Sequence, residues 1–514
     1  MSSGNFPSGG GARGEGATVA LTNPCSLAPA LPQGGRGQIL ARLGLWLRRR
    51  RGLVLALQWA VVLFYAVVVA VPAFLPLPGE TDHILNNLTR FAQFLFWGLW
   101  WPFVILSVMT LGRTWCGLFC PEGALTEFAS RWSLNRHIPA WLKWAGWPFV
   151  AFVLTTIFGQ MTSVYEYPKP ALLILGGSTL AAIAVGLLYG RNKRVWCRYL
   201  CPVSGVFGLL AKVAPLHFAV DRAAWDSPHV KSRPVNCAPL IDIRRMQSAS
   251  QCHMCGRCAG QRGAVALALR SPEKEILTSA AHVPPLSLCP SVALGAIPRS
   301  ARDRDSVASC ALRAGPSVGG GEQEAWSARL LVFGMLGVAL GAFQWSASPW
   351  YVAAKQRAAE WLIEKEVWWP LDAAGHWWLF TDYPELNDAF SWLDGGLLLA
   401  YIGATALVSG GWIWLCLRAA TALSGTHWTR LAMALIPFAG VSVFVGLSLL
   451  TTGQLFSEGI VLAWAPGARM ALLALAGLWS VSLAWRLGRA PAALGVGLAA
   501  LLPMWAWHQQ FYVW

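Results

Sequence analysis

Charged side chains are scarce in this sequence. Of its 514 residues only 12% are Asp, Glu, Lys or Arg, whereas 55% are hydrophobic. A soluble domain carries about 25% charged residues, so the composition excludes a chain built as one large water-exposed domain. Apolar runs near or above the roughly 20 residues that cross a bilayer recur along the sequence. We therefore predict an all-α polytopic membrane protein, and the 30 tryptophans suit its membrane–water interfaces.

Two further absences narrow the function. None of the nine histidines falls in the middle of an expected span, so haem held between paired histidines inside the bilayer is not expected. Acidic residues, the usual mark of an ion or proton path, are nearly absent from the same spans. The net charge of +16 is explained by membrane orientation, and nucleic acid is not an expected partner.

The distribution of Lys and Arg predicts the topology. Nine spans are expected, at about 53–75, 91–111, 144–161, 171–190, 327–346, 391–416, 430–450, 470–485 and 490–507. With the N-terminus inside, the inner segments hold 33 Lys and Arg residues and the outer loops hold six. Because basic residues collect on the cytoplasmic side, we predict a multi-pass protein of the bacterial inner membrane with a cytoplasmic N-terminus.

Four parts of the chain are expected. Residues 1–38, rich in Gly, Ser and Pro, form a disordered tail. Residues 39–214 form a transmembrane domain, and 215–326 a cytoplasmic ferredoxin-like segment and loop. Residues 327–514 form a second transmembrane domain, whose outside loop 347–390 carries an amphipathic helix that we expect on the outer membrane surface.

Twelve cysteines are present, and seven of them fall into three tight motifs. Two motifs repeat the pattern basic-x-Trp-Cys-x-x-x-Cys-Pro and contain Cys116 with Cys120 and Cys197 with Cys201. Proline favours the first position of a helix, so Cys120 and Cys201 are expected at N-caps, where the helix dipole favours a thiolate. The two pairs could meet across a pseudo-two-fold axis as a redox or second metal site. Alternatively, the motifs are turns that only end helices.

The third motif is Cys252-His-Met-Cys255-Gly-Arg-Cys258, the core of a bacterial ferredoxin run. Arg262 stands where the fourth cysteine of that run is expected. In two-cluster ferredoxins the fourth cysteine binds the other cluster, so an upstream cysteine should complete this one. Cys237 opens Cys-Ala-Pro-Leu-Ile-Asp-Ile-Arg, which resembles the Cys-Pro-x-x-Ile-Asp-Ile-Arg linker of membrane polyferredoxins.

These residues predict one [4Fe–4S] cluster held by Cys237, Cys252, Cys255 and Cys258. The following stretch, Gly263-Ala-Val-Ala-Leu, resembles the ferredoxin strand that closes over a cluster. A zinc site is the alternative, because zinc also accepts four thiolates, although usually from CxxC pairs. Cys289 and Cys310 are interpreted as ordinary loop thiols that could substitute as ligands, and Cys25 and Cys416 are given no role.

Residues from about 91 to 272 resemble polyferredoxin-type membrane 4Fe–4S proteins of the NapH, NosR and CcoG kinds. The resemblance rests on the paired CxxxCP motifs and on the cysteines at 237–258. It implies electron transfer in the inner membrane, serving a respiratory reductase or oxidase, with quinone as a possible partner beside membrane lipid. The chain departs from these proteins in having one ferredoxin run where two are common, and in its C-terminal half.

Three hypotheses follow. The first is an electron-transfer protein, an oxidoreductase component that links the quinone pool or a cytoplasmic donor to a respiratory enzyme. The second is an accessory or maturation factor that reduces or handles a metal such as copper through the CxxxCP thiols. The third is a redox-gated transporter or sensor.

Overall fold

The fold is built mainly of membrane-length helices. A computed structural model describes residues 35–79, 81–226, 234–246, 248–278 and 320–514. Within this part of the chain, seven helices are long and apolar enough to cross a membrane. They are Arg51–Phe74, Leu88–Leu111, Pro168–Leu188, Gly321–Gln344, Trp392–Ser424, Ile436–Ser457 and Ala465–Tyr512. The prediction of a polytopic helical membrane protein is therefore confirmed in its general form.

Three of the nine predicted spans do not each correspond to one membrane-length helix. The segment expected at 144–161 is the apolar helix α6 (Trp147–Met161), which has only 15 residues. The segments expected at 470–485 and 490–507 lie in one long element, α20 (Ala465–Tyr512). Its backbone leaves helical geometry at Gly488 and Arg489, at the expected boundary between these two segments. The number of membrane crossings therefore stays a prediction.

The CxxxCP region is a structural repeat. Its first unit runs through α3 (Leu88–Gln93), η2 (Phe94–Trp100), α4 (Trp101–Leu111), η3 (Trp115–Phe119) and α5 (Pro121–Ala129). Its second runs through α7 (Pro168–Ala171), η6 (Leu172–Gly176), α8 (Gly177–Leu188), α9 (Val195–Tyr199) and α10 (Pro202–Leu210).

The short helix of each unit packs on the membrane helix of the other. Helix α5 lies against α8, and α10 lies against α4. The first contact depends on Gly186, where an added Cβ would come within 2.6 Å of the Thr126 carbonyl oxygen. This crosswise packing brings the two cysteine motifs, about 80 residues apart in sequence, to one place in the fold.

The segment after the second unit forms a small layer at one end of the helices. Strands β1 (Leu216–Val220) and β2 (Val265–Leu269) pair antiparallel, with Leu216 opposite Leu269. The strand expected at Gly263-Ala-Val-Ala-Leu is therefore present as β2. Helix α1 (Gly35–Arg49) packs on β2, and Gly44 faces Leu267 there. Helix α1 begins inside the stretch 1–38 that we expected to be a tail, so the predicted boundary was too late.

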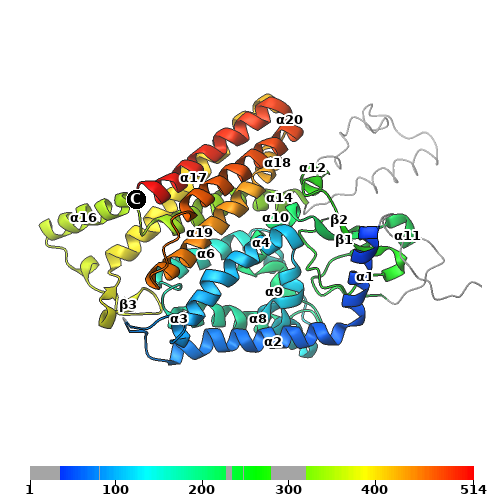
Figure 1. Cartoon of the computed structure of the whole chain (residues 1–514), viewed down its shortest axis with the longest axis horizontal. Coiled ribbons are helices and arrows are strands. Elements are labelled where there is room, and N and C mark those ends of the chain that lie inside the picture. Colours follow the sequence, from blue (N-terminus) through cyan, green and yellow to red (C-terminus); the bar gives the residue numbers. More distant parts are fainter. Residues whose placement is uncertain (1–34, 80, 227–233, 247, 279–319) are drawn as a thin grey trace, which may run out of the picture.

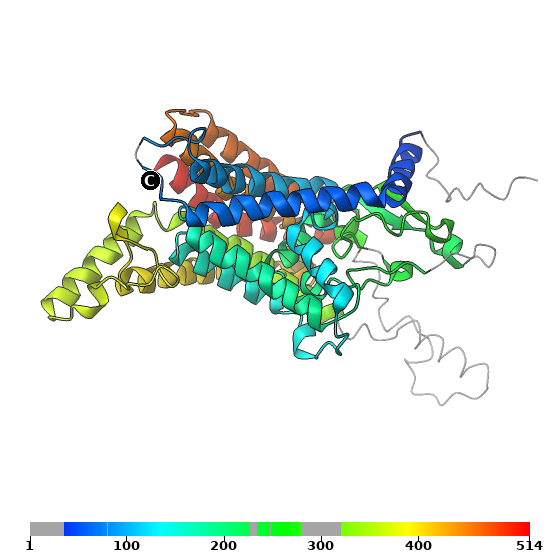
Figure 2. The ribbon, with the colours of Figure 1, turned by 90° about the horizontal axis from the view of Figure 1, so that it is seen from below.

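The described helices and strands include different elements at the two ends of the molecule. Figures 1 and 2 show α1, β1, β2 and α11 (Arg222–Asp226) at one end, with α16 (Pro349–Glu364) and the C-terminus at the other. Between them lies a hydrophobic core shared by both halves of the chain. The region predicted as outside loop 347–390 thus lies opposite the ferredoxin-like segment, and its expected helix is α16.

The other elements are as follows. The helices are α2 (Arg51–Ala70), α12 (Lys274–Thr278), α14 (Gly320–Arg329), η11 (Leu330–Val338), α15 (Ala339–Gln344), α17 (Trp392–Ser424), α18 (Trp428–Ala434) and α19 (Ile436–Ser457). A two-stranded sheet joins β3 (Asp382–Tyr383) to β4 (Asp388–Ala389). Short 3₁₀ turns are η1 (Val71–Phe74), η4 (Ser130–Trp132), η5 (Trp141–Lys143), η7 (Ala211–Val213), η8 (Ile243–Arg245), η9 (Gln261–Gly263), η12 (Trp369–Leu371) and η13 (Pro384–Leu386).

Candidate functional site

The four cysteines predicted as cluster ligands surround one small cavity. Cys237, Cys252, Cys255 and Cys258 all line a space of about 20 Å³. The loop that carries the last three turns sharply, with positive φ at Met254 (53°) and Gly256 (74°). The structure therefore brings Cys237, 15 residues before Cys252, to the same cavity as the triplet.

Burial raises the pKa of three of these thiols, those of Cys237, Cys252 and Cys258, and so favours their protonated form when no metal is bound. Burial raises the pKa of Cys252 to about 12, and the neighbouring Cys255 and Cys237 add to the rise. Burial also raises the pKa of Cys258 well above its ordinary value, with contributions from the other three sulfurs. Four thiols crowded together cannot all ionise unless a cation compensates, which is what metal binding supplies.

The surroundings of this cavity suit an anionic cluster. His253 and Arg257 also line it, and His253 Nδ1 and Arg257 Nε are buried with no hydrogen-bond partner among the described residues. Within the same part of the chain, no three His, Cys, Asp or Glu side chains are placed to hold a single metal ion. A four-iron cube is held differently, since each thiolate binds a separate iron. Four thiols around a cavity with unused buried polar groups therefore fit an iron–sulfur cube.

The CxxxCP cysteines occupy the helix N-termini expected for them. Cys120 is the N-cap of α5 and Cys201 the N-cap of α10, and each is followed by proline at the first helical position. The Gly123 N–H donates to Cys120 Sγ at 3.4 Å, whereas Cys201 Sγ makes no such bond. The N-cap prediction is confirmed for both cysteines.

All four CxxxCP cysteines also line a single cavity. This larger space, of about 260 Å³, has Cys116, Cys120, Cys197 and Cys201 in its wall. The rest of the wall is largely aromatic and aliphatic, including Tyr65, Trp97, Trp100, Phe343 and Val443. Among the polar residues in this wall is Glu122, whose carboxylate accepts hydrogen bonds from Ser178 Oγ (2.6 Å) and Trp196 Nε1 (3.0 Å).

The two groups of four cysteines are in direct backbone contact. Gly117, between Cys116 and Cys120, lies so close to the ferredoxin-like loop that an added Cβ would stand 1.9 Å from the His253 carbonyl oxygen and 2.9 Å from the Cys255 nitrogen. The carbonyl of Gly117 in turn accepts a 2.8 Å hydrogen bond from Nε2 of Gln58, a buried amide in helix α2. Only glycine allows this approach, so one residue fixes the distance between the two sites.

An arginine from each repeat unit crosses to the other unit. Arg194 Nη1 donates to the Cys116 carbonyl at 2.6 Å. Arg113 Nη2 donates to Ser204 Oγ (2.9 Å), which donates to the Cys197 carbonyl (2.8 Å). Both arginines are nearly fully buried, at 2% and 5% exposure. Each therefore supports the first cysteine of the opposite motif.

The same two arginines hold the ferredoxin-like segment. The backbone N–H of Arg194 donates to the Ala238 carbonyl at 2.8 Å, next to Cys237. Arg113 Nη1 donates to the Ser250 carbonyl at 2.9 Å, two residues before Cys252. Two hydrogen bonds, one from a backbone group and one from a side chain, thus tie the CxxxCP repeat to both ends of the loop that carries the other cysteines.

Glu127 completes the junction. Its carboxylate accepts from Arg194 Nε at 2.8 Å and also pairs with Arg257, which lies between Cys255 and Cys258. Burial opposes ionisation of Glu127, but Arg194 and Arg257 outweigh it and lower the pKa of the carboxyl. The carboxylate is therefore a fixed negative charge between two guanidinium groups.

Sequence reasoning missed several of these residues. An amide inside an apolar run was a signal for Gln58, and the basic position in both CxxxCP motifs was one for Arg113 and Arg194. Nothing in the sequence pointed to Glu127 or Arg257 as partners. Cys25, Cys289 and Cys310 lie outside the described residues, and Cys416 lies in α17, away from both cavities.

Comparison with known proteins matches the same region. A family model described as a 4Fe-4S binding domain matches residues 93–140 and 173–220, so each match contains one CxxxCP motif. No solved structure matches the chain. The iron–sulfur prediction is thereby confirmed in its general form, while the number of clusters is not addressed.

Three curated proteins are similar over about 180 residues. "Regulatory protein NosR" of Pseudomonas aeruginosa is 26% identical over 31% of this chain and 25% of its own length. "Ferredoxin-type protein NapH" of Escherichia coli K12 is 25% identical over 30% of this chain and 60% of its own length. "Putative electron transport protein YccM" of the same strain is 23% identical over 30% and 50%.

The chain thus spans a quarter to three fifths of the length of these relatives. The C-terminal half lies outside the matched 4Fe-4S domain. The predicted resemblance to polyferredoxin-type membrane 4Fe–4S proteins is confirmed by the domain matches and by the relatives.

Proposed function

We propose that the chain carries electrons between the quinone pool or a cytoplasmic donor and a respiratory reductase or oxidase system. In this proposal Cys237, Cys252, Cys255 and Cys258 hold one [4Fe–4S] cluster, and the CxxxCP cysteines form a second redox or metal site. The protein would act as an oxidoreductase component in the bacterial inner membrane, with its N-terminus and ferredoxin-like segment on the cytoplasmic side.

The contact at Gly117 is the observation that carries this proposal. Electron transfer between two centres slows steeply with distance, so centres that exchange electrons must be close. The cysteine groups lie on either side of one glycine, and no side chain intervenes at that point. When bound, the clusters supply one-electron chemistry. The chain's own residues fix their separation, keep out water and place Arg113, Arg194 and Arg257 beside them.

The apolar cavity supports quinone as one electron-transfer partner. Cofactor and ligand sites are mostly apolar, with a few placed polar groups, and here the polar groups include Glu122, Tyr65 and the thiols. Glu122 is held by Ser178 and Trp196, so it is positioned to exchange a proton with a quinol hydroxyl. A proton acceptor beside a one-electron centre is what quinol oxidation needs.

The test is anaerobic purification followed by iron and sulfide analysis and EPR on the reduced protein. Cys258→Ser should remove the ferredoxin-type signal, and Cys416→Ser, a thiol away from both cavities, should leave iron and EPR unchanged. Reduction by a soluble quinol analogue should produce the same EPR signal. Glu122→Gln should slow this reduction by quinol while the iron content stays unchanged. Protein without iron, or without a signal on reduction, would refute the proposal.

The CxxxCP cavity also supports a second candidate function, the handling of a metal by its four thiols. Four thiols line this cavity of about 260 Å³, and none of them belongs to the ferredoxin-like group. A maturation factor would bind a soft metal such as Cu(I) there, because thiolates select such metals.

A further inference from the structure

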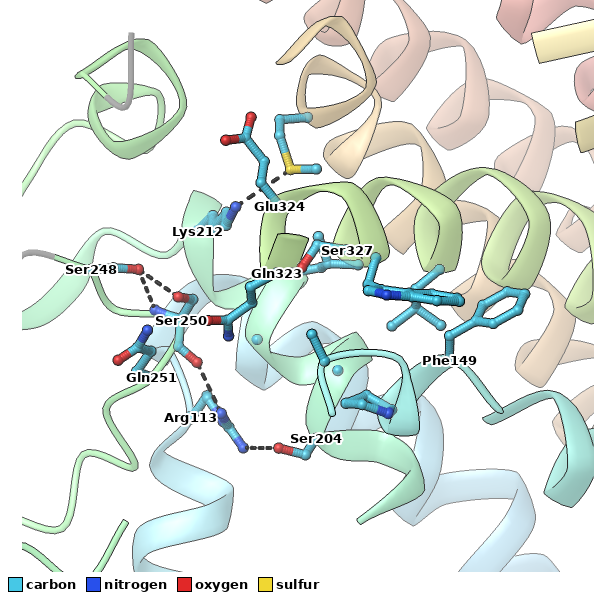
Figure 3. Close-up of a pocket in the computed structure, with 18 of the residues that line it drawn as sticks. Arg113, Phe149, Ser204, Lys212, Ser248, Ser250, Gln251, Gln323, Glu324 and Ser327 are labelled. Carbon is cyan, nitrogen blue, oxygen red and sulfur yellow. Dashed lines mark hydrogen bonds between the residues drawn. The ribbon is translucent and has the colours of Figure 1, made fainter. Parts of the chain in front are cut away.

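A second, polar cavity lies at the inner ends of the helices and adjoins the CxxxCP group, because Cys197 is in its wall. It has a volume of about 310 Å³ and opens between the ferredoxin-like segment, α10, α14 and α18. Figure 3 shows Arg113, Lys212, Ser248, Ser250 and Gln251 gathered on one side of it, with Phe149 on the other.

Positive charge converges on this cavity from four separate elements. Arg113 follows α4, Arg198 belongs to α9, Lys212 to η7 and Arg430 to α18, and all four line the cavity. The carboxylates in the wall are those of Glu275 and Glu324, and Glu275 is already paired with Arg270 at 2.6 Å. The lining therefore carries a clear excess of positive charge.

The cations here lack acidic partners within the described part of the chain. No ion pair joins Arg113, Arg198, Lys212 or Arg430 to an Asp or Glu there. Arg113 Nε and Arg430 Nη2 are buried without any hydrogen-bond partner in the same part of the chain. Lys212 Nζ donates to the thioether sulfur of Met433 at 3.4 Å, a weak acceptor for an ammonium group.

Such an arrangement is costly unless an anion occupies it. A buried donor left unpaired costs about 1–3 kcal/mol, and more when the group is charged. A bound anion would supply the missing partner for these donors.

The far wall of the cavity is apolar. Phe149 and Trp326 lie there with ring centroids 5.9 Å apart, next to Leu330 at the start of η11. A ligand with a charged head and an apolar remainder would satisfy both sides. Basic pockets between membrane helices on the cytoplasmic side are typical sites for anionic lipid headgroups.

We propose that this cavity binds a phosphate group, presented by an anionic phospholipid headgroup or by free phosphate. Arginine and lysine are the usual binders of phosphate, and Arg113, Lys212 and Arg430 would hold it. Cys197 lines this cavity, and Arg113 also donates to the Ser250 carbonyl, so the occupied site adjoins the CxxxCP group and lies one side chain away from the ferredoxin-like loop.

The test uses the purified full-length holoprotein and two probes. Delipidated protein is placed in nanodiscs of phosphatidylcholine with or without phosphatidylglycerol, and retained lipid is measured by native mass spectrometry. In parallel, inorganic phosphate is titrated calorimetrically into protein in detergent. Lys212→Gln and Arg430→Gln should each weaken binding about tenfold, the effect of one lost charge-assisted contact. Arg136→Gln, an exposed inner-side arginine outside this cavity, is the control.

The results of these measurements distinguish the two sources of the phosphate group. Selective retention of phosphatidylglycerol assigns the site to a lipid headgroup, and phosphate binding of equal strength assigns it to the free anion. Lys212→Gln disturbs little else, because the one hydrogen bond found for its ammonium is to Met433, so it remains informative if Arg430→Gln folds poorly. Binding of neither probe, or equal loss in Arg136→Gln, overturns the proposal. Iron content is measured in every variant, so loss of the clusters is distinguished from loss of the anion site.

Discussion

The guanidinium of Arg194 donates a 2.6 Å hydrogen bond to the carbonyl of Cys116, 78 residues earlier in the chain. The reverse contact runs from Arg113 through Ser204 to the carbonyl of Cys197. Each half of the repeat is thus held by the arginine of the other half. A chain that carried only one CxxxCP unit would leave its arginine buried without this partner.

Arg194→Ala should therefore destabilise the protein strongly. The change removes one partner of a buried ion pair, which typically costs about 3–5 kcal/mol, and we expect the low end because Glu127 keeps Arg257. It also frees the Cys116 carbonyl. The thermal unfolding midpoint of the purified protein measures the effect, with the neighbouring exposed Arg191→Ala as control. Equal midpoints for the two variants would contradict the role given to Arg194.

Parts of this site follow from sequence because they depend on neighbouring residues. Proline after Cys120 and Cys201 marks a helix start wherever the helix lies, and the apolar Val265–Leu269 stretch forms a strand as expected. The CxxCxxC spacing likewise fixes three sulfurs within one loop.

Other parts depend on packing between distant segments. No local pattern tells that Glu127 pairs with Arg257, 130 residues away, or that Gln58 binds the carbonyl of Gly117. The sequence did not predict where α1 starts, because the first residues of this helix resemble the Gly-rich tail before it. The helix is stabilised by packing one of its faces on β2, which lies far away in sequence. The break in α20 at Gly488 and Arg489 lies at the boundary expected from the sequence, and Gly488 packs there against Ser424 and Thr426.

Gly117→Ala should separate the two cysteine groups. Its new Cβ would overlap the His253 carbonyl oxygen, so the ferredoxin-like loop must move. Overpacking of this kind costs about 1–3 kcal/mol, and we expect loss of iron from the ferredoxin-type site together with a slower electron exchange in freeze-quench EPR. Gly177→Ala in α8, where an added Cβ meets nothing within 4 Å, is the matched control. Normal iron content and kinetics in Gly117→Ala would show that the contact is not needed.

Glu127→Gln should change how stability depends on pH. The folded-state pKa of Glu127 is lowered below the ordinary value of 4.5, by Arg194 and Arg257 acting against burial. A lowered pKa means that its stabilising effect is complete above the unfolded-state value and disappears as pH falls through the folded-state value. The wild type should thus unfold at a higher temperature than Glu127→Gln at pH 7, and the gap should shrink toward and below pH 4. Glu360→Gln, exposed on α16, should show no gap at either pH.

Cys197→Ser and Cys258→Ser should separate the two functions proposed for the cysteine groups. If the CxxxCP thiols relay electrons, Cys197→Ser should stop quinol-dependent reduction while the ferredoxin-type EPR signal stays reducible by dithionite. If they handle metal, the wild type should bind Cu(I) at this cavity, and Cys197→Ser should lose that copper with its iron intact. Cys258→Ser should do the converse, keeping copper and losing the EPR signal, because Cys258 lines the other cavity. Loss of both metals in both variants would mean that the two groups form one site, since two sites joined only through Gly117 retain separate ligand sets.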